Sequence, residues 1–225
     1  MKKLMQFFCF LMFLSFGINA QDAKTNLSLQ VSAAAKTNRG QLAAYVWTRT
    51  TQIFLEGELK NTIVSSLSIG PDGKMVTTAV SSTPTSAPPT KGIRGKIAKN
   101  KIDDLKDYID EAMKVSMGYL YMSQGKMVDF FNAAGISQSG TTITVSGSNV
   151  NQANDQAILL LNSTSLAYIS ETFKSAMSGG DAIGGTVNYK TFDNGLTAID
   201  NATLDLPAKK MKFMISNTNY AKKLQ

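Results

Sequence analysis

Histidine is absent from this sequence of 225 residues, and cysteine occurs once, as Cys9. The absence of histidine excludes His-based catalytic triads and His-ligated metal centres, because histidine is the side chain that titrates near neutral pH and the commonest metal ligand. Cys9 lies inside the apolar N-terminal segment. If that segment is removed, no disulfide and no thiol nucleophile remain. Core packing alone must then hold the fold, which a domain of this size can achieve.

Acidic residues are fewer than basic ones. The sequence has 16 Asp and Glu and 23 Lys and Arg, which gives a formal net charge of +7. The basic residues are scattered, and their densest group lies near the C-terminus, at Lys209, Lys210, Lys212, Lys222 and Lys223. A nucleic-acid interface would need a continuous basic patch, which these scattered residues do not form. We interpret these lysines as solubilising charge beside strand ends and expect no nucleic-acid partner.

Long hydrophobic runs are missing except at the N-terminus, where residues 4–16 are almost wholly apolar. Lys2 and Lys3 precede this run, and small residues ending at Ala20 follow it. This order is typical of a secretory signal peptide, with cleavage between Ala20 and Gln21. A membrane anchor is the alternative, but a membrane-spanning helix needs about 20 apolar residues and this run is shorter.

The residue after the predicted cleavage site argues against a lipid anchor. A lipoprotein signal places a cysteine there, whereas this chain has Gln21, and Cys9 lies within the apolar core of the segment. We therefore expect a signal peptide over residues 1–20 and a single periplasmic domain over residues 21–225. We expect that domain to be soluble, with no stable membrane span after cleavage.

Helical periodicity marks three segments. Residues 26–43 form a moderate pattern that Gly40 weakens. Residues 101–120 form the strongest pattern, with Asn100 as the expected N-cap. Their apolar stripe consists of Ile102, Leu105, Ile109, Ala112, Met113 and Leu120. Ser123 is expected to cap a shorter third helix that ends at Gly135.

Period-two alternation marks the strands. Residues 45–55 place Trp47, Ile53 and Leu55 on one face, and Leu67 continues an apolar face in the next segment. Residues 70–73 form a strong turn into a third strand over residues 74–80, and residues 81–92 are expected to be a loop. Six later strands are predicted at residues 141–148, 156–162, 165–173, 185–192, 196–204 and 209–216.

The connections between the later strands are short, which requires an antiparallel meander because parallel strands need long crossovers. The predicted fold class is α+β: a curved antiparallel β-sheet, a half-barrel-like meander covered by about three helices. A sheet of this many strands curls, and helices lying against its inner face either leave an apolar cavity or fill it.

Three sequence patterns could indicate a catalytic site, and each lacks a feature that the chemistry requires. The adjacent carboxylates Asp103 and Asp104 diverge on a helix surface, so they do not converge on one bond. The glycines at residues 179–185 lack the strand, helix and Lys-Ser/Thr of a phosphate loop. Ser123 and Lys126 match a Ser-x-x-Lys hydrolase pattern, but its partner motifs are missing and Ser123 has a simpler role as a cap. We expect no enzymatic activity, no cofactor and no metal.

The order of short motifs resembles a group of uncharacterised exported bacterial proteins over most of the mature chain. The segments that carry the resemblance are Tyr45-Val46-Trp47, Gly70-Pro71-Asp72-Gly73-Lys74, Ile93-Arg94-Gly95, Ala208-Lys209-Lys210 and Asn217-Thr218-Asn219-Tyr220. The architecture is similar to the LolA/LppX type of half-barrel, which implies carriage of lipids or of lipoprotein acyl chains across the periplasm. The Ala20-Gln21 junction resembles exported proteins of Bacteroidetes-type Gram-negative bacteria. None of the family's functional residues is carried over to this chain.

Two hypotheses follow. The first is a soluble periplasmic carrier or binding protein for an apolar ligand, either a lipid or the acyl chain of a lipoprotein. The second is a non-enzymatic structural or interaction protein of the cell envelope, with a filled core and a protein partner. For the first hypothesis, the candidates for an apolar ligand lining are Trp47, Ile53, Leu55, Leu67, Leu105, Ile109, Met113 and Phe213.

Overall fold

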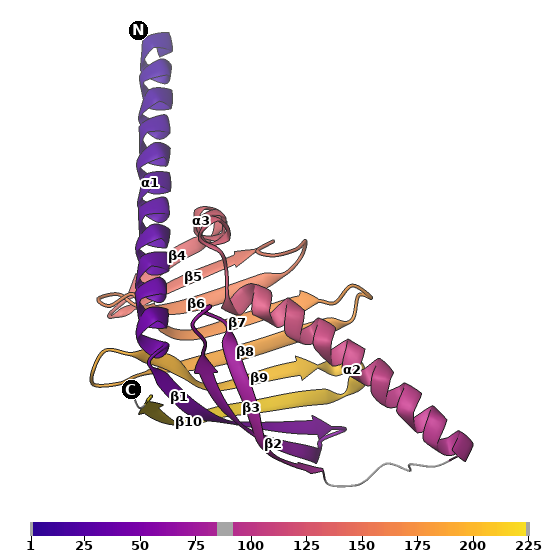
Figure 1. Ribbon diagram of the computed structural model, residues 1–225. Helices are drawn as coiled ribbons and strands as arrows, with labels where there is room; N and C mark the ends of the chain where they lie inside the picture. Colours follow the sequence, from indigo (N-terminus) through magenta and orange to yellow (C-terminus); the bar gives the residue numbers. More distant parts are fainter. Residues whose placement is uncertain (1, 85–91, 224–225) are drawn as a thin grey trace.

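The computed structural model describes the backbone of residues 2–84 and 92–223, and the side chains of residues 21–83 and 105–223. Over these residues the chain forms three α-helices and one antiparallel sheet of ten strands. The sheet curls, and α2 crosses its face (Figure 1). The predicted fold class, a curved antiparallel half-barrel-like sheet with about three helices, is confirmed.

The helices are α1 (Lys2–Leu42), α2 (Gly92–Leu120) and α3 (Gln124–Ala133), with a short 3-10 turn at Pro207–Lys209. The strands before α2 are β1 (Tyr45–Leu55), β2 (Glu58–Ile69) and β3 (Met75–Pro84). The strands after α3 are β4 (Gly135–Ser139), β5 (Thr142–Ser148), β6 (Gln156–Asn162), β7 (Tyr168–Ala176), β8 (Ala182–Thr191), β9 (Thr197–Leu206) and β10 (Met211–Lys222).

The strand order is β3-β2-β1-β10-β9-β8-β7-β6-β5-β4. The first and last strands of the chain, β1 and β10, therefore pair side by side, as the third and fourth strands from the β3 edge of the sheet. The segment that contains α2 and α3 connects the two edge strands, β3 and β4. This connection is what brings α2 across the face of the sheet. We call β1–β3 the small wing and β4–β10 the large wing.

Local chemistry explains the sharp turns of the small wing. Glu56 and Gly57 both have positive φ values, 54° and 84°, as a two-residue hairpin loop of the type I′ class requires. In the next turn, the N–H of Gly73 donates to the carbonyl of Gly70 at 3.0 Å, and Gly73 has φ 75°. The Asp72 carboxylate accepts a hydrogen bond from the N–H of Lys74 at 3.0 Å and completes the turn.

The buried apolar residues divide into two clusters. The main core belongs to the large wing and its helices, and it contains Tyr119, Phe131, Leu161 and Leu206, none more than 2 % exposed. The second cluster is small and consists of Trp47, Leu67 and Ile69 on the small wing. Among the described side chains, the small wing therefore contributes fewer fully buried apolar residues than the large wing.

Several boundaries differ from the sequence-based expectation. α2 begins at Gly92, so Asn100 lies inside the helix and the predicted N-cap there is wrong. β4 was missed, so seven strands follow α3 and not six. Ala134, in extended conformation, ends α3, while Gly135 opens β4. Ser123 caps α3 as predicted, accepting a hydrogen bond from the N–H of Lys126 at 3.4 Å.

The predicted loop over residues 81–92 is wrong at its start, because β3 continues to Pro84, and residues 85–91 lie outside the described residues. β7 begins at Tyr168, three residues later than expected, since the chain turns at residues 163–165. Ala20 and Gln21 lie within α1, and cleavage between them stays a prediction. Within the described part of the chain, no helix combines the length and hydropathy that a bilayer crossing needs.

Candidate ligand-binding cavity

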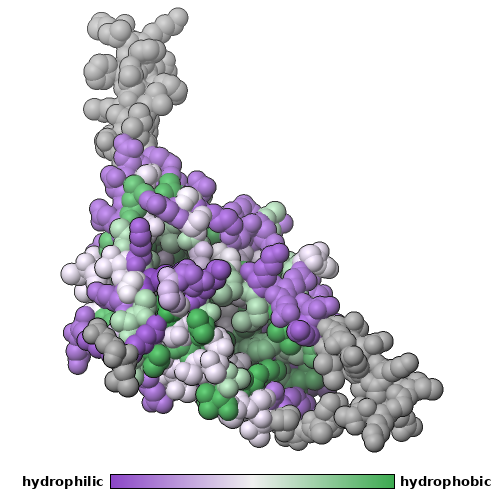
Figure 2. Space-filling view, in the orientation of Figure 1, coloured by the Kyte–Doolittle hydropathy of each residue, from purple (hydrophilic) through white to green (hydrophobic). Residues whose placement is uncertain are grey.

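A cavity of about 1040 Å³ lies between the C-terminal part of α1, the end of α2 and the inner face of the sheet. Its volume is at the upper end of the roughly 300–1,000 Å³ that ligand pockets occupy. In the orientation of Figure 2, hydrophilic residues surround α1, whereas hydrophobic residues gather lower on the body, over the small wing and beside α2. The structure therefore has space for a ligand between the ends of these two helices and the sheet.

The apolar lining comes from both sides of the cavity. Leu42 of α1, Trp47 of β1 and Ile69 of β2 line one side, and Met117 and Leu120 of α2 line the other. Trp47 is 4 % exposed, and its ring stacks on Tyr220 with centroids 5.6 Å apart. Methionine side chains adapt their shape to irregular apolar surfaces, so this lining can accommodate ligands of different shape.

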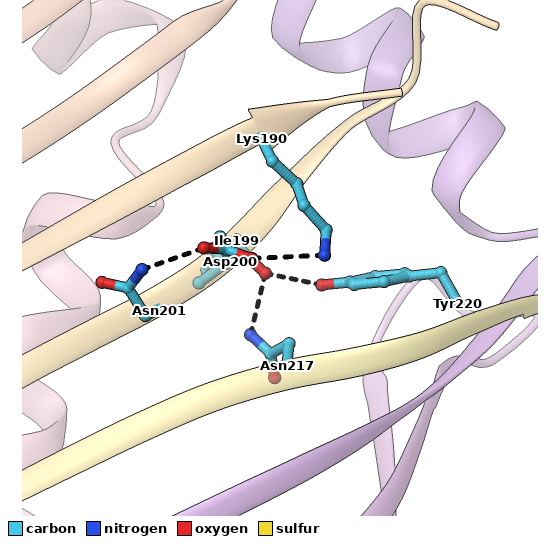
Figure 3. Close-up of polar contacts among 6 residues, drawn as sticks. All are labelled: Lys190, Ile199, Asp200, Asn201, Asn217 and Tyr220. Atoms are coloured by element: carbon cyan, nitrogen blue, oxygen red, sulfur yellow. Dashed lines mark hydrogen bonds and ion pairs between the residues drawn. The ribbon is translucent and has the colours of Figure 1, made fainter. Parts of the chain in front are cut away.

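Side-chain hydrogen bonds connect β9 and β10 beside the cavity, at the point where the backbone hydrogen bonds between these two strands stop. β9 and β10 pair as far as Asn201 and Ser216, and beyond that point they separate. There the Ile199 carbonyl accepts hydrogen bonds from Asn217 Nδ2 at 3.1 Å and from the Tyr220 hydroxyl at 2.6 Å (Figure 3). Because Ile199 lines the cavity, this network seals the sheet beside it.

Asp200, the residue after Ile199 in β9, forms an ion pair beside this network. Asp200 lies 3.2 Å from the Lys190 ammonium and accepts a hydrogen bond from Asn201 Nδ2 at 3.0 Å (Figure 3). The register of β8 and β9 shifts between Asn188 and Tyr189, so Asp200 is the extra residue of a β-bulge. The Lys190 ammonium also lies 5.6 Å from the centre of the Tyr220 ring, which fixes that ring from a second direction.

Arg49 is a cation on the inner face of β1. Its Nε donates to Asn217 Oδ1 at 3.0 Å, and no carboxylate among the described residues forms an ion pair with it. Burial lowers the pKa of Arg49, and the neighbouring hydroxyls of Tyr121 and Tyr220 partly offset this. Tyr121 lines the cavity, so a half-buried positive charge acts on one of the lining residues.

Glu171 is a carboxylic acid on the inner face of β7, with 2 % of its surface exposed. Burial raises its pKa to about 7, and a hydrogen bond with Tyr189 acts in the opposite direction. Its Oε1 has no hydrogen-bond partner among the described residues. Tyr168 and Tyr189 both interact electrostatically with Glu171, their ring centroids are 5.4 Å apart, and both tyrosines line the cavity.

The end of α2 is fastened to the large wing by a buried polar network. The Tyr119 hydroxyl donates to Asp155 Oδ2 at 2.5 Å, and its ring stacks on Phe173 with centroids 4.5 Å apart. Asp155 also accepts hydrogen bonds from the N–H groups of Val150, Asn151 and Gln152. Burial alone would raise the pKa of Asp155, but these hydrogen bonds outweigh it and hold the pKa below its ordinary value.

Of the eight residues predicted to line a ligand site, Trp47 lies on the cavity wall. Leu67 packs with Trp47 in the small cluster. Ile53, Leu55, Leu105 and Ile109 pack against the main core, Phe213 lies within it, and Met113 is 37 % exposed. The structure therefore does not bring these eight side chains together around one space.

Sequence reasoning missed the tyrosines of the cavity, Tyr121, Tyr168 and Tyr189, and the charged residues Arg49 and Glu171 behind them. One signal was available, since Glu171 shares the strand parity of buried Phe173 and is therefore a carboxylate on an apolar face. Among the described residues, no group of three or more acidic or cysteine side chains is arranged to hold a metal ion.

No family model matches this sequence, and no curated protein matches it. Solved structures do resemble the chain. A DUF1329 family protein from Desulfovibrio piger is 8% identical with a TM-score of 0.41, covering 90% of this chain and 93% of that one. A LolA superfamily protein from Nitrosomonas europaea is 9% identical with a TM-score of 0.35, covering 88% and 94%.

A third solved structure is described as an outer membrane lipoprotein-sorting protein domain and comes from Vibrio parahaemolyticus. It is 7% identical with a TM-score of 0.34, and the match covers 85% of this chain and 91% of that one.

Proposed function

We propose that this protein is an exported, non-enzymatic carrier or binding protein for an apolar ligand, either a lipid or the acyl chain of a lipoprotein. The observation that carries the proposal is the cavity of about 1040 Å³ with Leu42, Trp47, Ile69 and Met117 on its wall. Apolar surface that stays in contact with water is unfavourable, at about 25 cal/mol per Å², so an apolar chain that enters the cavity gains this free energy.

The proposal includes a location. We propose that residues 1–20 are a signal peptide, that the mature domain begins at Gln21, and that it works in the periplasm without a lipid anchor. The short apolar run before Ala20 supports this. Mass spectrometry of the intact protein from a periplasmic extract should give the mass of residues 21–225. Retention of residues 1–20 in a membrane fraction would contradict it.

The test of function is native mass spectrometry of protein purified from its own periplasm, which should show lipid bound to the folded chain. Added lipid should also raise the melting temperature as saturation increases. A protein that carries no lipid and shows no thermal shift with phospholipid or fatty acid would instead fit the envelope interaction protein.

A matched pair of variants on α1 sharpens this test. Ala35 lines the cavity, whereas Ala33 is exposed and does not. Ala35→Trp should fill part of the space and reduce the bound lipid, while Ala33→Trp adds the same side chain to the solvent side of the helix and should leave it unchanged. Equal lipid content in the two variants would place the ligand elsewhere.

A further inference from the structure

The charged residues of the cavity lining all have one sign. Lys36 and Arg39 of α1 and Lys74 at the start of β3 line the cavity, and no Asp or Glu lines it among the described residues. The cavity thus combines an apolar wall with a positive potential, which attracts anions and repels cations.

Two contacts bring these cations to one end of the cavity. Arg39 Nη2 donates to the Gly73 carbonyl at 2.7 Å, which joins the end of α1 to the turn that precedes Lys74. Lys36 lies three residues before Arg39 on the same helix, and residues at that spacing share a helix face. The three positive groups therefore border the same opening between α1 and the β2–β3 turn.

The acidic residue nearest in sequence does not neutralise this end. Asp72 lies 3.4 Å from the Lys74 ammonium, but the side chains of Asp72 and Lys74 are 57% and 83% exposed, so water screens the pair. The Arg39 guanidinium lies 5.3 Å from the centre of the Tyr121 ring. Arg49 interacts electrostatically with Tyr121, and its half-buried charge has no carboxylate partner among the described residues.

We propose that the ligand is a lipid with an anionic headgroup. Its chain lies against Trp47, Ile69 and Met117, and its oxyanion meets Lys36, Arg39 and Lys74 at the opening. This inference rests on the proposed carrier function and adds the headgroup class to it. The headgroup stays partly hydrated because Lys36 and Lys74 are exposed, so the binding does not require burial of an unpaired charge.

The test compares ligands that share one chain and differ in the headgroup. Calorimetry or a fluorescent-probe displacement assay gives Kd for dodecanoic acid, dodecyl phosphate, 1-dodecanol and dodecyltrimethylammonium. Both anionic ligands should bind at least about fivefold more tightly than the cationic ligand. Added salt should weaken the anionic pair and leave 1-dodecanol unchanged. The two anionic arms distinguish a carboxylate from a phosphate headgroup.

Amino-acid substitutions then test whether the lysines at the opening cause the preference for anionic ligands. Lys36→Gln combined with Lys74→Gln should weaken dodecanoic acid about threefold to tenfold and leave 1-dodecanol unchanged. Lys212→Gln is the control, because Lys212 is exposed, pairs with Asp205 and does not line the cavity. Both changed lysines are exposed, so the fold is expected to persist, and circular dichroism checks it.

The outcomes separate the two proposals. If 1-dodecanol and dodecyltrimethylammonium bind as tightly as dodecanoic acid, the headgroup inference is wrong and the carrier function stands. If the double variant and Lys212→Gln lose the same affinity, the opening is not the headgroup site. If none of the four ligands binds, both proposals fail together.

Discussion

The large wing, β4–β10, packs its inner face against all three helices and buries a continuous apolar core, whereas the small wing, β1–β3, has three buried apolar side chains among its described residues, Trp47, Leu67 and Ile69. Both wings consist of antiparallel strands. They differ in composition, because β2 and β3 are rich in Ser and Thr.

Apolar faces attract helices, so α1 and α3 settle where the large wing supplies the most apolar surface. The cavity lies beside strands of both wings, where the ends of α1 and α2 approach the sheet. Trp47 and Ile69 line it from the small wing, and Tyr168, Tyr189 and Ile199 line it from the large wing. One sheet thus carries both a closely packed core and an empty site.

The largest expected effect compares one leucine from each wing. Leu161 and Leu67 are 0% and 1% exposed. Leu161→Ala should lower the free energy of unfolding by about 3–5 kcal/mol, and Leu67→Ala by about 2–3 kcal/mol, because side chains beside an existing cavity relax more easily into the new space. Urea denaturation measures both. A cost at Leu67 equal to or above that at Leu161 would remove the distinction between the wings.

The next effect concerns the buried carboxyl group of Glu171. Its pKa is about 7 in the folded protein and lies above the ordinary value of 4.5, so its contribution to stability is full below pH 4.5 and is lost as the pH rises through 7. The amide of Glu171→Gln does not ionise, so the variant should not lose this stability as the pH rises. The free energy of unfolding should rise by up to about 3 kcal/mol at pH 8 relative to wild type and change little at pH 4.5. A gain that is independent of pH would disprove the assignment.

A smaller effect should follow from Asp155→Asn, which weakens the network that holds Tyr119 and the end of α2 on the large wing. The expected cost is about 2 kcal/mol at pH 7, because hydrogen bonds to a charged acceptor lose strength. The folded pKa of Asp155 is depressed, so its contribution is present above the ordinary value of 3.8 and lost as the pH falls through the folded value. The difference between variant and wild type should therefore shrink in strong acid, which thermal denaturation from pH 7 to pH 2 will show.

The smallest effects belong to the outer face of the small wing. Gln52 pairs with Met214, which is 43% exposed, and Val80 is 67% exposed. Gln52→Ala and Val80→Thr should each change the free energy of unfolding by less than about 0.5 kcal/mol. Chemical denaturation of the two variants beside Leu67→Ala tests the assignment of faces. A loss at Gln52 as large as that at Leu67 would show that the strand faces are reversed.

The sequence by itself determined the features that arise from neighbouring residues. The bounds of β1, Tyr45–Leu55, follow from period-two alternation, and the turn at residues 70–73 follows from its Gly, Pro and Asp. The N-cap at Ser123 also depends on neighbouring residues, since its hydroxyl oxygen accepts a hydrogen bond from the N–H of Lys126. β4 was missed because its residues, Gly135–Ser139, form a short polar segment without clear alternation, and the hairpin with β5 stabilises it.

The tertiary structure alone decided where the cavity lies and what surrounds it. Its lining joins α1 and the end of α2 to Tyr168 and to residues 195–199, segments that are far apart in the sequence. The pairing of β1 with β10 brings Arg49 opposite Asn217, and the packing of β7 beside β8 brings Glu171 within hydrogen-bond reach of Tyr189. Alternation tells which face of a strand is apolar, but burial, shifted pKa values and empty space depend on which distant segment covers that face. Long-range pairing sets that choice, and in this chain it left an open space beside strands of both wings.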